Sequence, residues 1–196
     1  MLTELLTTPG VTESSRLAGP VGLMAFHGGS LERVTDQIVD AVAARCDVST
    51  YIIRQPEGFR WHVPSTAFDP AESPALARFV EHVEVAIAIH GYGRDQMYTT
   101  LLAGGQHREL AAHLAGHLRA ALPEYTTLDD LDLIPATLRG LRDENPVNLV
   151  RDRGVQLELP PRVRGLGPFW GGEEPRIDSD HTQSLVDALV AACTTW

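Results

Sequence analysis

The chain contains no lysine, because all sixteen of its basic residues are arginine. This absence excludes a lysine Schiff base and the lysine of a phosphate-binding P-loop. Twenty-six acidic residues bring the formal net charge to −10. Such an acidic balance argues against nucleic acid or an anionic membrane as the main partner.

Cysteine is also scarce, since only Cys46 and Cys193 are present and they lie far apart in the sequence. A disulfide framework is therefore not indicated. No apolar run approaches the ~20 residues that span a bilayer, and the N-terminus lacks the basic leader and apolar block of a signal peptide. We expect a reduced, cytoplasmic setting. The sequence makes no prediction of oligomeric state.

Two common catalytic signatures are missing as well. Ser30 follows two glycines but lacks the GxSxG pattern of a serine hydrolase. The run Gly91-Tyr92-Gly93 does not complete the GxGxxG fingerprint of a dinucleotide site. The chemistry of this chain must therefore be sought in other residues.

Apolar runs alternate with amphipathic segments along the whole chain, whose 196 residues suffice for one domain with a full core. We expect a single α/β domain over residues 1–196, with three α/β/α layers and a mixed, mainly parallel central sheet. A short helix and a loop are expected within residues 2–18, and residues 124–153 give no clear pattern. The expected strands are 21–26, 50–53, 59–63, 83–89, 98–102 and 155–159. The expected helices are 32–45, 75–82 and 109–122, and a final helix that is capped by Asp178 or Ser179 and runs to about residue 194.

Four side chains stand at or just beyond the ends of these strands. His27 follows the strand 21–26, and Glu32 comes after the Gly-Gly turn, in the first turn of the expected helix 32–45. His90 follows the most apolar strand, and Glu158 interrupts the apolar run GVQLELP. The carboxyl ends of strands are where α/β proteins build their sites. Two histidines and one glutamate form a catalytic zinc set, and a further buried glutamate is the general base that such a zinc needs.

Each of these residues also has a purely structural interpretation. His27 and His90 can be satisfied histidines at strand ends, and Glu32 can cap a helix. Alternation can place Glu158 on the solvent face of an edge strand, with Leu157 and Leu159 on the core face. If Glu158 is buried instead, its carboxylate must be paired or functional.

The remaining histidines are weaker candidates. His62 lies near an expected strand end and can reach the same site. His113 and His117 are four residues apart on a helix, a spacing that allows a metal pair, but they flank the buried leucine stripe and are better explained by a packed or exposed helix. His107 and His181 are expected at the surface.

The ordered set of motifs resembles the poly-γ-glutamate hydrolase family, which is related to zinc carboxypeptidases. The matching segments are AFHGGSLE (25–32), WHVPSTAFD (61–69), IAIHGYGRD (87–95), LRGLRDENPVNLVRDR (138–153) and GVQLELPPRVR (154–164). The segment GLGPFWGGEEPR (165–176) has no counterpart in this resemblance.

The resemblance implies a carboxypeptidase-like α/β/α fold and a Zn²⁺ cofactor. It implies His27, Glu32 and His90 as the zinc ligands, and Glu158 as the catalytic general base and acid. The expected reaction is hydrolysis of an amide bond of a γ-glutamyl or poly-γ-glutamate type.

Two arginines are candidates for binding a substrate carboxylate, because a guanidinium matches that group in a bidentate manner. Arg94 follows His90 closely, and Arg153 precedes the strand 155–159. Structural salt bridges are the alternative role for both.

The negative charge of the chain constrains the substrate. A polyanion is repelled at long range, so a long poly-γ-glutamate chain would need a local groove lined by arginine. A small carboxylate-bearing N-acyl amino acid would be repelled less, which keeps an N-acyl amino acid amidohydrolase as the rival enzyme. A binding domain with an idle zinc is the alternative that is not an enzyme.

Overall fold

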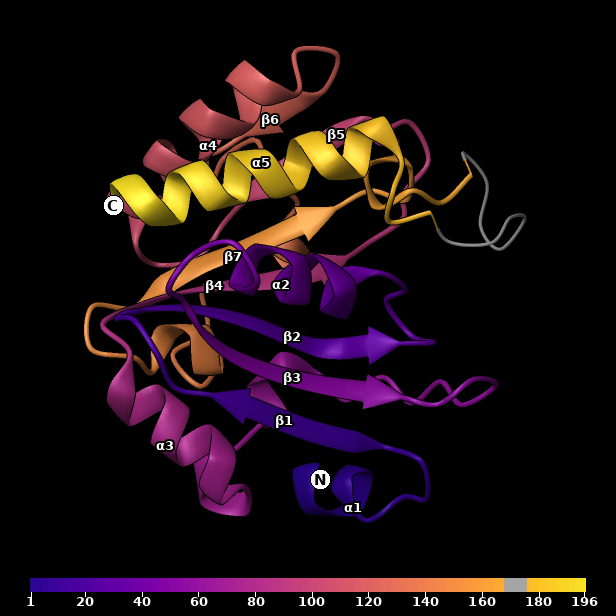
Figure 1. The fold of residues 1–196 in the computed structure, drawn as a ribbon, viewed down its shortest axis with the longest axis vertical. Coiled ribbons are helices and arrows are strands. Elements are labelled where there is room, and N and C mark those ends of the chain that lie inside the picture. The colour runs from indigo at the N-terminus through magenta and orange to yellow at the C-terminus, as the bar shows by residue number, and fades with distance from the viewer. Residues whose placement is uncertain (168–175) are drawn as a thin grey trace.

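The fold is built on one seven-stranded sheet with the order β1-β3-β2-β4-β7-β5-β6 (Figure 1). The computed structural model describes residues 1–167 and 176–196. Within the sheet β3, β2, β4 and β7 run parallel to one another, β1 is antiparallel to β3, and β5 is antiparallel to β7. The strands are β1 (Thr12–Arg16), β2 (Val21–Gly29), β3 (Ser49–Gln55), β4 (Val85–Gly91), β5 (Thr100–Ala103), β6 (Thr126–Leu128) and β7 (Gly154–Leu159).

In the part of the chain that the structure describes, five α-helices cover the two faces of the sheet and give the expected three layers (Figure 1). Helices α2, α4 and α5 pack on one face, where the inward side chains of β2, β4 and β7 include Leu23, Ile87 and Leu157. Helices α1 and α3 pack on the other face, against residues such as Phe26 and Ala88. The helices are α1 (Leu2–Leu6), α2 (Thr35–Ala43), α3 (Pro74–His82), α4 (Arg108–Ala121) and α5 (Asp180–Thr195).

The α/β fold with a mixed, mainly parallel sheet is confirmed. Helix α5 begins as the sequence indicates, because the Ser179 side chain accepts a hydrogen bond from the backbone N–H of Thr182. The expected strand 59–63 is wrong, since this segment is an irregular loop that leads to a 3₁₀ turn at Ser65–Ala67.

Two short strands were missed. The strand β1 has the polar sequence TESSR and an exposed burial pattern, because it forms the edge of the sheet. The strand β6 has only three residues, within the stretch that gave no clear pattern. Most of the segment 165–176, which has no counterpart in the resemblance, lies outside the described residues.

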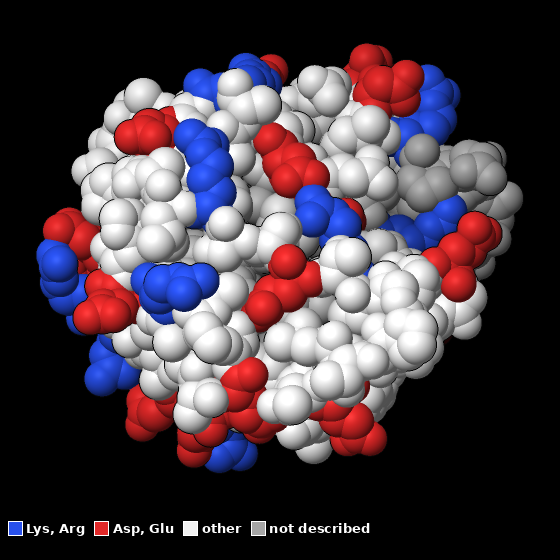
Figure 2. All heavy atoms as spheres, turned by 60° about the horizontal axis from the view of Figure 1, so that its bottom comes forward, with Lys and Arg blue, Asp and Glu red and all other residues white. Residues whose placement is uncertain are grey.

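Acidic and basic side chains are interspersed on the face drawn in Figure 2, and neither sign forms a continuous area there. Among the helices of residues 1–167 and 176–196, none is both long and apolar enough to cross a bilayer.

The end of β2 requires glycine, which gives a prediction for stability. Gly29 has a φ of +74°, and a Cβ there would lie 2.1 Å from the carbonyl oxygen of Gln55 on β3. Gly58 has a similar φ of +78°, but a Cβ there would meet nothing within 4 Å. We expect Gly58→Ala to lower the free energy of unfolding by about 1 kcal/mol, which is the cost of the left-handed backbone. Gly29→Ala should cost at least about 2 kcal/mol more, because β2 and β3 must also separate.

Urea denaturation of the two variants measures the difference. Equal losses would show that the close approach of β2 and β3 at Gly29 does not constrain the fold.

Candidate metal centre and active site

Three neighbouring parallel strands carry the candidate residues at their carboxyl ends. His27 lies on β2, His90 on β4 and Glu158 on β7, and His90 and Glu158 are register partners. The chain passes from β2 to β3 on one side and returns to β4 on the other, so the order of the strands reverses at β2 and β4. Such a switch point opens a crevice at the strand ends, where α/β folds bind their ligands.

An irregularity in β2 turns His27 toward this crevice. Ala25 pairs with Ile52 of β3, but Gly28, three residues later, pairs with Arg54, only two residues later. The strand β2 therefore contains one extra residue at this point. Strict alternation would place His27 on the same face as Ala25, which packs with α2. Instead its ring contacts the ring of Phe68, on the opposite face of the sheet. Irregularities of this kind commonly redirect a side chain at a site.

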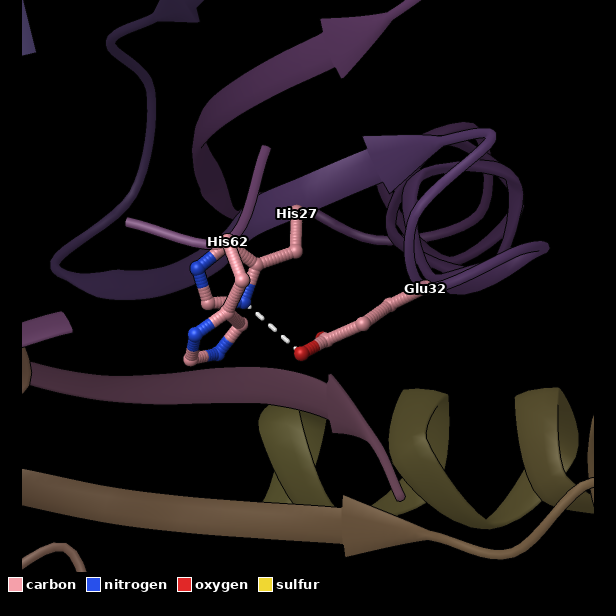
Figure 3. A group of neighbouring side chains, drawn as sticks. All are labelled: His27, Glu32 and His62. Atoms are coloured by element: carbon pink, nitrogen blue, oxygen red, sulfur yellow. Dashed lines mark hydrogen bonds and ion pairs between the residues drawn. The ribbon is translucent and has the colours of Figure 1, made fainter. Parts of the chain in front are cut away.

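Glu32 lies in a turn before α2 and not in the helix itself, so the expected position in the first helical turn is wrong. The backbone N–H of Glu32 donates to the carbonyl oxygen of His27 at 2.8 Å, which closes the turn. Val34 then takes a φ of +78°, a strained conformation for a β-branched residue, before α2 begins at Thr35. The chain thereby doubles back, and the Glu32 side chain points to His27 (Figure 3).

The carboxylate of Glu32 lies between both histidines. His27 Nδ1 is 2.7 Å from Glu32 Oε1, and His90 Nδ1 is 3.3 Å from Oε2. The backbone N–H of Gly91 also donates to Oε2 at 2.9 Å. Burial alone would raise the pKa of Glu32, but the two histidines hold it well below its usual value. Burial likewise disfavours a charged His90, yet Glu32, aided by Glu158, raises the pKa of His90 to about 9.

The hydrogen bonds of His27 show that this group suits a cation. His27 Nε2 lies 2.8 Å from the backbone oxygen of Val63, which can only accept, so Nε2 carries the hydrogen. The other nitrogen, Nδ1, faces the carboxylate oxygen of Glu32. A proton or a metal ion must then lie between two electron-rich atoms. Two imidazole nitrogens and a carboxylate oxygen, with one ring oriented by a backbone carbonyl, are a donor set that zinc takes.

His62 is a third histidine at this centre. Its ring centroid lies 4.8 Å from that of His27, and single ligand atoms of His27, Glu32 and His62 lie within 4.8 Å of one another (Figure 3). His90 does not belong to that closest group. However, His90 is 3% exposed and fixed on a central strand, whereas His62 is exposed on an irregular loop. We favour His90 as the ligand, because a buried side chain has fewer accessible rotamers and because its ring already faces Glu32.

Glu158 is buried, so the interpretation as a solvent-facing residue on an edge strand is wrong. The strand β7 lies inside the sheet, and Glu158 is 4% exposed. Its Oε1 accepts a hydrogen bond from Gln156 at 2.8 Å, and Gln156 Oε1 accepts one from Asn145 at 2.8 Å. Burial raises the pKa of Glu158 to about 7, against the lowering effect of His90. A carboxyl group with this pKa exchanges protons readily near neutral pH.

A cavity of about 760 Å³ is lined by all five of these side chains, His27, Glu32, His62, His90 and Glu158. Its first wall is the loop from His62 to Thr66, and its second wall is the segment from Ala136 to Arg142. The metal-binding candidates and Glu158 thus share one chamber between two loops, and a substrate in it would contact both.

The two arginines predicted to bind the substrate, Arg94 and Arg153, do not line this cavity. Arg94 is exposed and donates to Thr137 at 3.2 Å, so it contacts the second wall from outside. Arg153 precedes β7 at the end opposite Glu158, where it pairs with Asp143 at 3.3 Å.

A buried arginine near the centre was missed by the sequence analysis. Arg164 is 3% exposed, and its guanidinium donates to the backbone oxygens of Arg33 and Tyr92. A Cβ on Gly91 would lie 2.6 Å from this guanidinium, so only glycine fits beside it. Burial lowers the pKa of Arg164 to about 10, although Glu32 favours its charge. Arg164 donates to residues next to the turn that carries Glu32 and to the end of β4 that carries His90, but its sequence context gives no sign of burial.

The pair His113 and His117 lies far from this cavity. Their rings are 4.8 Å apart on α4, and His113 Nε2 bonds to the carbonyl oxygen of Ala192 at 3.1 Å. The two rings lie between α4 and α5, which agrees with the expectation of a packed helix and not with a metal pair.

The geometry can be compared with known proteins. A sequence model of the poly-γ-glutamate hydrolase family matches residues 3–167. The fold superimposes on a bacteriophage poly-γ-glutamate hydrolase with a TM-score of 0.80, at 22% identity over 98% of this chain and 93% of that one. No curated protein sequence matches.

Two further solved structures share the fold. The zinc-free form of YndL has a TM-score of 0.74, at 19% identity over 94% of this chain and 89% of that one. An N-formylglutamate amidohydrolase from Ralstonia eutropha JMP134 has a TM-score of 0.53, at 14% identity over 93% and 97%. Identities this low show the fold alone, whereas the family match spans most of the sequence. The expected family is therefore confirmed: the chain belongs to the poly-γ-glutamate hydrolase family, whose members hydrolyse amide bonds.

Proposed function

We propose that this protein is a zinc-dependent hydrolase that cleaves γ-glutamyl amide bonds of the poly-γ-glutamate type. The observation that carries the proposal is the common cavity, in which a buried carboxyl group lies beside a set of zinc-type donors. The family match supports the amide-hydrolase class.

Three side chains are proposed to hold the metal ion: His27, Glu32 and His90. Their donor atoms already face one another around the Glu32 carboxylate. A zinc ion held there would supply Lewis-acid polarisation of a substrate carbonyl and ready ionisation of water. The Val63 carbonyl orients the ring of His27, so Nδ1 would be the nitrogen that binds the cation.

Glu158 is the proposed general base and acid. As a carboxylate it accepts a proton from the attacking water, and as a carboxylic acid it returns that proton to the leaving amine. Its pKa near 7 suits both directions of transfer. The bonds from Asn145 to Gln156 and from Gln156 to Glu158 hold the carboxyl group in place.

The cavity volume of about 760 Å³ fits a substrate of a few residues, since ligand pockets commonly enclose roughly 300–1,000 Å³. A γ-linked glutamyl segment is the proposed occupant because of the family. Assays with γ-linked glutamyl peptides, α-linked glutamyl peptides and N-acyl amino acids, run side by side, decide the class. Preferential cleavage of the N-acyl amino acids would replace this proposal by the rival amidohydrolase.

Measurements of zinc affinity distinguish His90 from His62 as the third metal ligand. We expect His90→Ala to lower zinc affinity by at least about 100-fold, because it removes a buried ligand. His62→Ala should change the affinity by less than about tenfold, because that side chain is exposed. Competition with a chromogenic chelator measures both constants. The opposite order would assign the third ligand to His62.

The variant Glu158→Gln tests the proton-transfer role. It keeps the shape of the side chain but cannot accept a proton, so kcat on a γ-glutamyl amide should fall by about 10²–10⁴-fold. Zinc content, measured by atomic emission, should stay at the wild-type level. Full activity of this variant would contradict the role of Glu158.

The pKa of Glu158 also predicts how stability depends on pH. A carboxyl group whose pKa is raised on folding contributes its full stability below its ordinary pKa of about 4.5, and this contribution is lost as the pH rises through 7. In chelator-treated protein, Glu158→Gln should therefore be more stable than the wild type at pH 8, by roughly 3 kcal/mol.

At pH 4.5 this advantage should nearly vanish, because the carboxyl group of Glu158 is then neutral in the folded state and only about half ionised in the unfolded state. Urea denaturation of the two proteins at both pH values measures it. A difference that does not change with pH would show that burial does not raise the pKa of Glu158.

A further inference from the structure

Two arginines on the second wall of the cavity have no role in the chemistry described so far. Arg139 and Arg142 both line the cavity, and they come from the segment that faces the loop from His62 to Thr66. Neither was a candidate in the sequence analysis, which favoured Arg94 and Arg153.

No carboxylate of the described residues forms an ion pair with the guanidinium groups of Arg139 and Arg142. Arg139 donates from Nε to the backbone oxygen of Ile134 at 2.9 Å, which leaves its two terminal nitrogens available. Within residues 1–167 and 176–196, no carboxylate oxygen lies within 4 Å of the nitrogens of Arg139 or Arg142. Arg151 and Arg153, only a few residues further along the chain, both form ion pairs. In a chain of net charge −10, these two guanidiniums make the second wall locally positive, whereas the carboxyl groups of the cavity, Glu32 and Glu158, lie outside that wall.

The backbone that carries these arginines is held firmly in place. Asn148 Nδ2 donates to the carbonyl oxygens of Gly140 at 2.7 Å and Arg142 at 2.9 Å. The backbone N–H of Gly105 donates to the carbonyl oxygen of Arg139 at 2.6 Å. Asn148 is itself buried, so the anchoring bonds are shielded from water. The two long side chains therefore start from a rigid base, which lowers the entropy lost when they bind an anion.

The same segment lies against the residue that positions Glu158. Gly140 has a φ of +64°, and a Cβ there would lie 2.5 Å from the Cβ of Gln156. Gln156 donates to Glu158 at 2.8 Å. A substrate group bound by the arginines of this wall would thus lie next to the carboxyl group that handles the proton.

We propose that Arg139 and Arg142 form an anion subsite that binds the α-carboxylate of a γ-linked glutamyl residue beside the scissile amide. This inference rests on the proposed function and specifies how the substrate is recognised. A γ-linked glutamyl chain carries one free α-carboxylate on each residue, and a guanidinium binds a carboxylate through two parallel hydrogen bonds. Besides His62, the first wall offers Pro64, Ser65 and Thr66, which carry no charge, so the permanent positive charges that attract the carboxylate are those of the second wall.

The subsite also explains how a protein of negative net charge can bind an anionic substrate. Long-range repulsion of an anionic substrate by a protein of charge −10 is screened over roughly 10 Å in ordinary buffer. Inside that distance the nearest charges decide, and at the second wall these are the two arginines.

Two matched probes test the subsite: a short γ-linked glutamate peptide with free α-carboxylates, and the same peptide with α-carboxamides. The proteins are the zinc-loaded wild type, Arg139→Gln, Arg142→Gln and the double variant. Arg151→Gln is the matched control, because it removes the same charge from an exposed arginine that pairs with Glu84 outside the cavity. Steady-state kinetics give KM and kcat for both probes. Calorimetry in a Glu158→Gln background gives binding without turnover.

The double variant should raise KM and Kd for the carboxylate probe by at least about tenfold, which is the loss expected for a charge-assisted hydrogen bond. Its constants for the carboxamide probe should stay within about twofold, as should both sets for Arg151→Gln. Equal losses on both probes, or no loss on either, would overturn the subsite. So would a wild type that binds the two probes equally well.

The binding arm separates this inference from the proposed function. If the wild type hydrolyses neither probe but binds the carboxylate form in a manner that depends on Arg139 and Arg142, the subsite stands and the hydrolase proposal fails. If it hydrolyses both probes at equal KM, the hydrolase stands and the subsite fails.

Discussion

The site depends on one carboxylate that is shared between two histidines. Glu32 faces His27 Nδ1 with one oxygen and His90 Nδ1 with the other, and the backbone N–H of Gly91 holds the second oxygen. Each histidine comes from a different central strand, so the carboxylate joins β2 to β4 at the point where the order of the strands reverses. Buried charges of this kind are stable only when they are paired, and a cation can replace the protons that lie between this carboxylate and the two imidazoles.

The surrounding architecture supports this arrangement from three directions. The irregularity in β2 aims His27 at the crevice, and the strained turn at Val34 returns the chain so that Glu32 reaches it. Arg164 occupies the space behind Gly91, where any larger residue would collide with it. Two buried asparagines complete the other side: Asn145 acts through Gln156 on Glu158, and Asn148 anchors the wall that bears two free arginines. The proposed metal ligands, the proposed base and the wall with the two arginines are thus each held by hydrogen bonds or packing from buried residues.

The fold class could be predicted from the sequence because the central strands are nearly continuous apolar runs, which are recognised by their hydrophobic pattern and composition. Sequence reasoning also placed the four main candidates at strand ends, and the sheet order then made those ends adjacent. It failed where tertiary contacts decide. The polar edge strand β1 has no apolar pattern, and nothing in the sequence marks Arg164 as buried or Arg139 as facing a cavity. Arg153 was misleading because it precedes β7 and so lies at the amino end of that strand, opposite the carboxyl end that carries Glu158.

The most direct test of the account is the crystal structure of the zinc-loaded protein, with anomalous diffraction recorded at the zinc edge. The account predicts one strong peak at about 2.0–2.2 Å from His27 Nδ1, His90 Nδ1 and a Glu32 oxygen, with the Glu158 carboxyl group facing the same cavity. A peak elsewhere, or an undisturbed contact between His27 and Glu32 at saturating zinc, would contradict it.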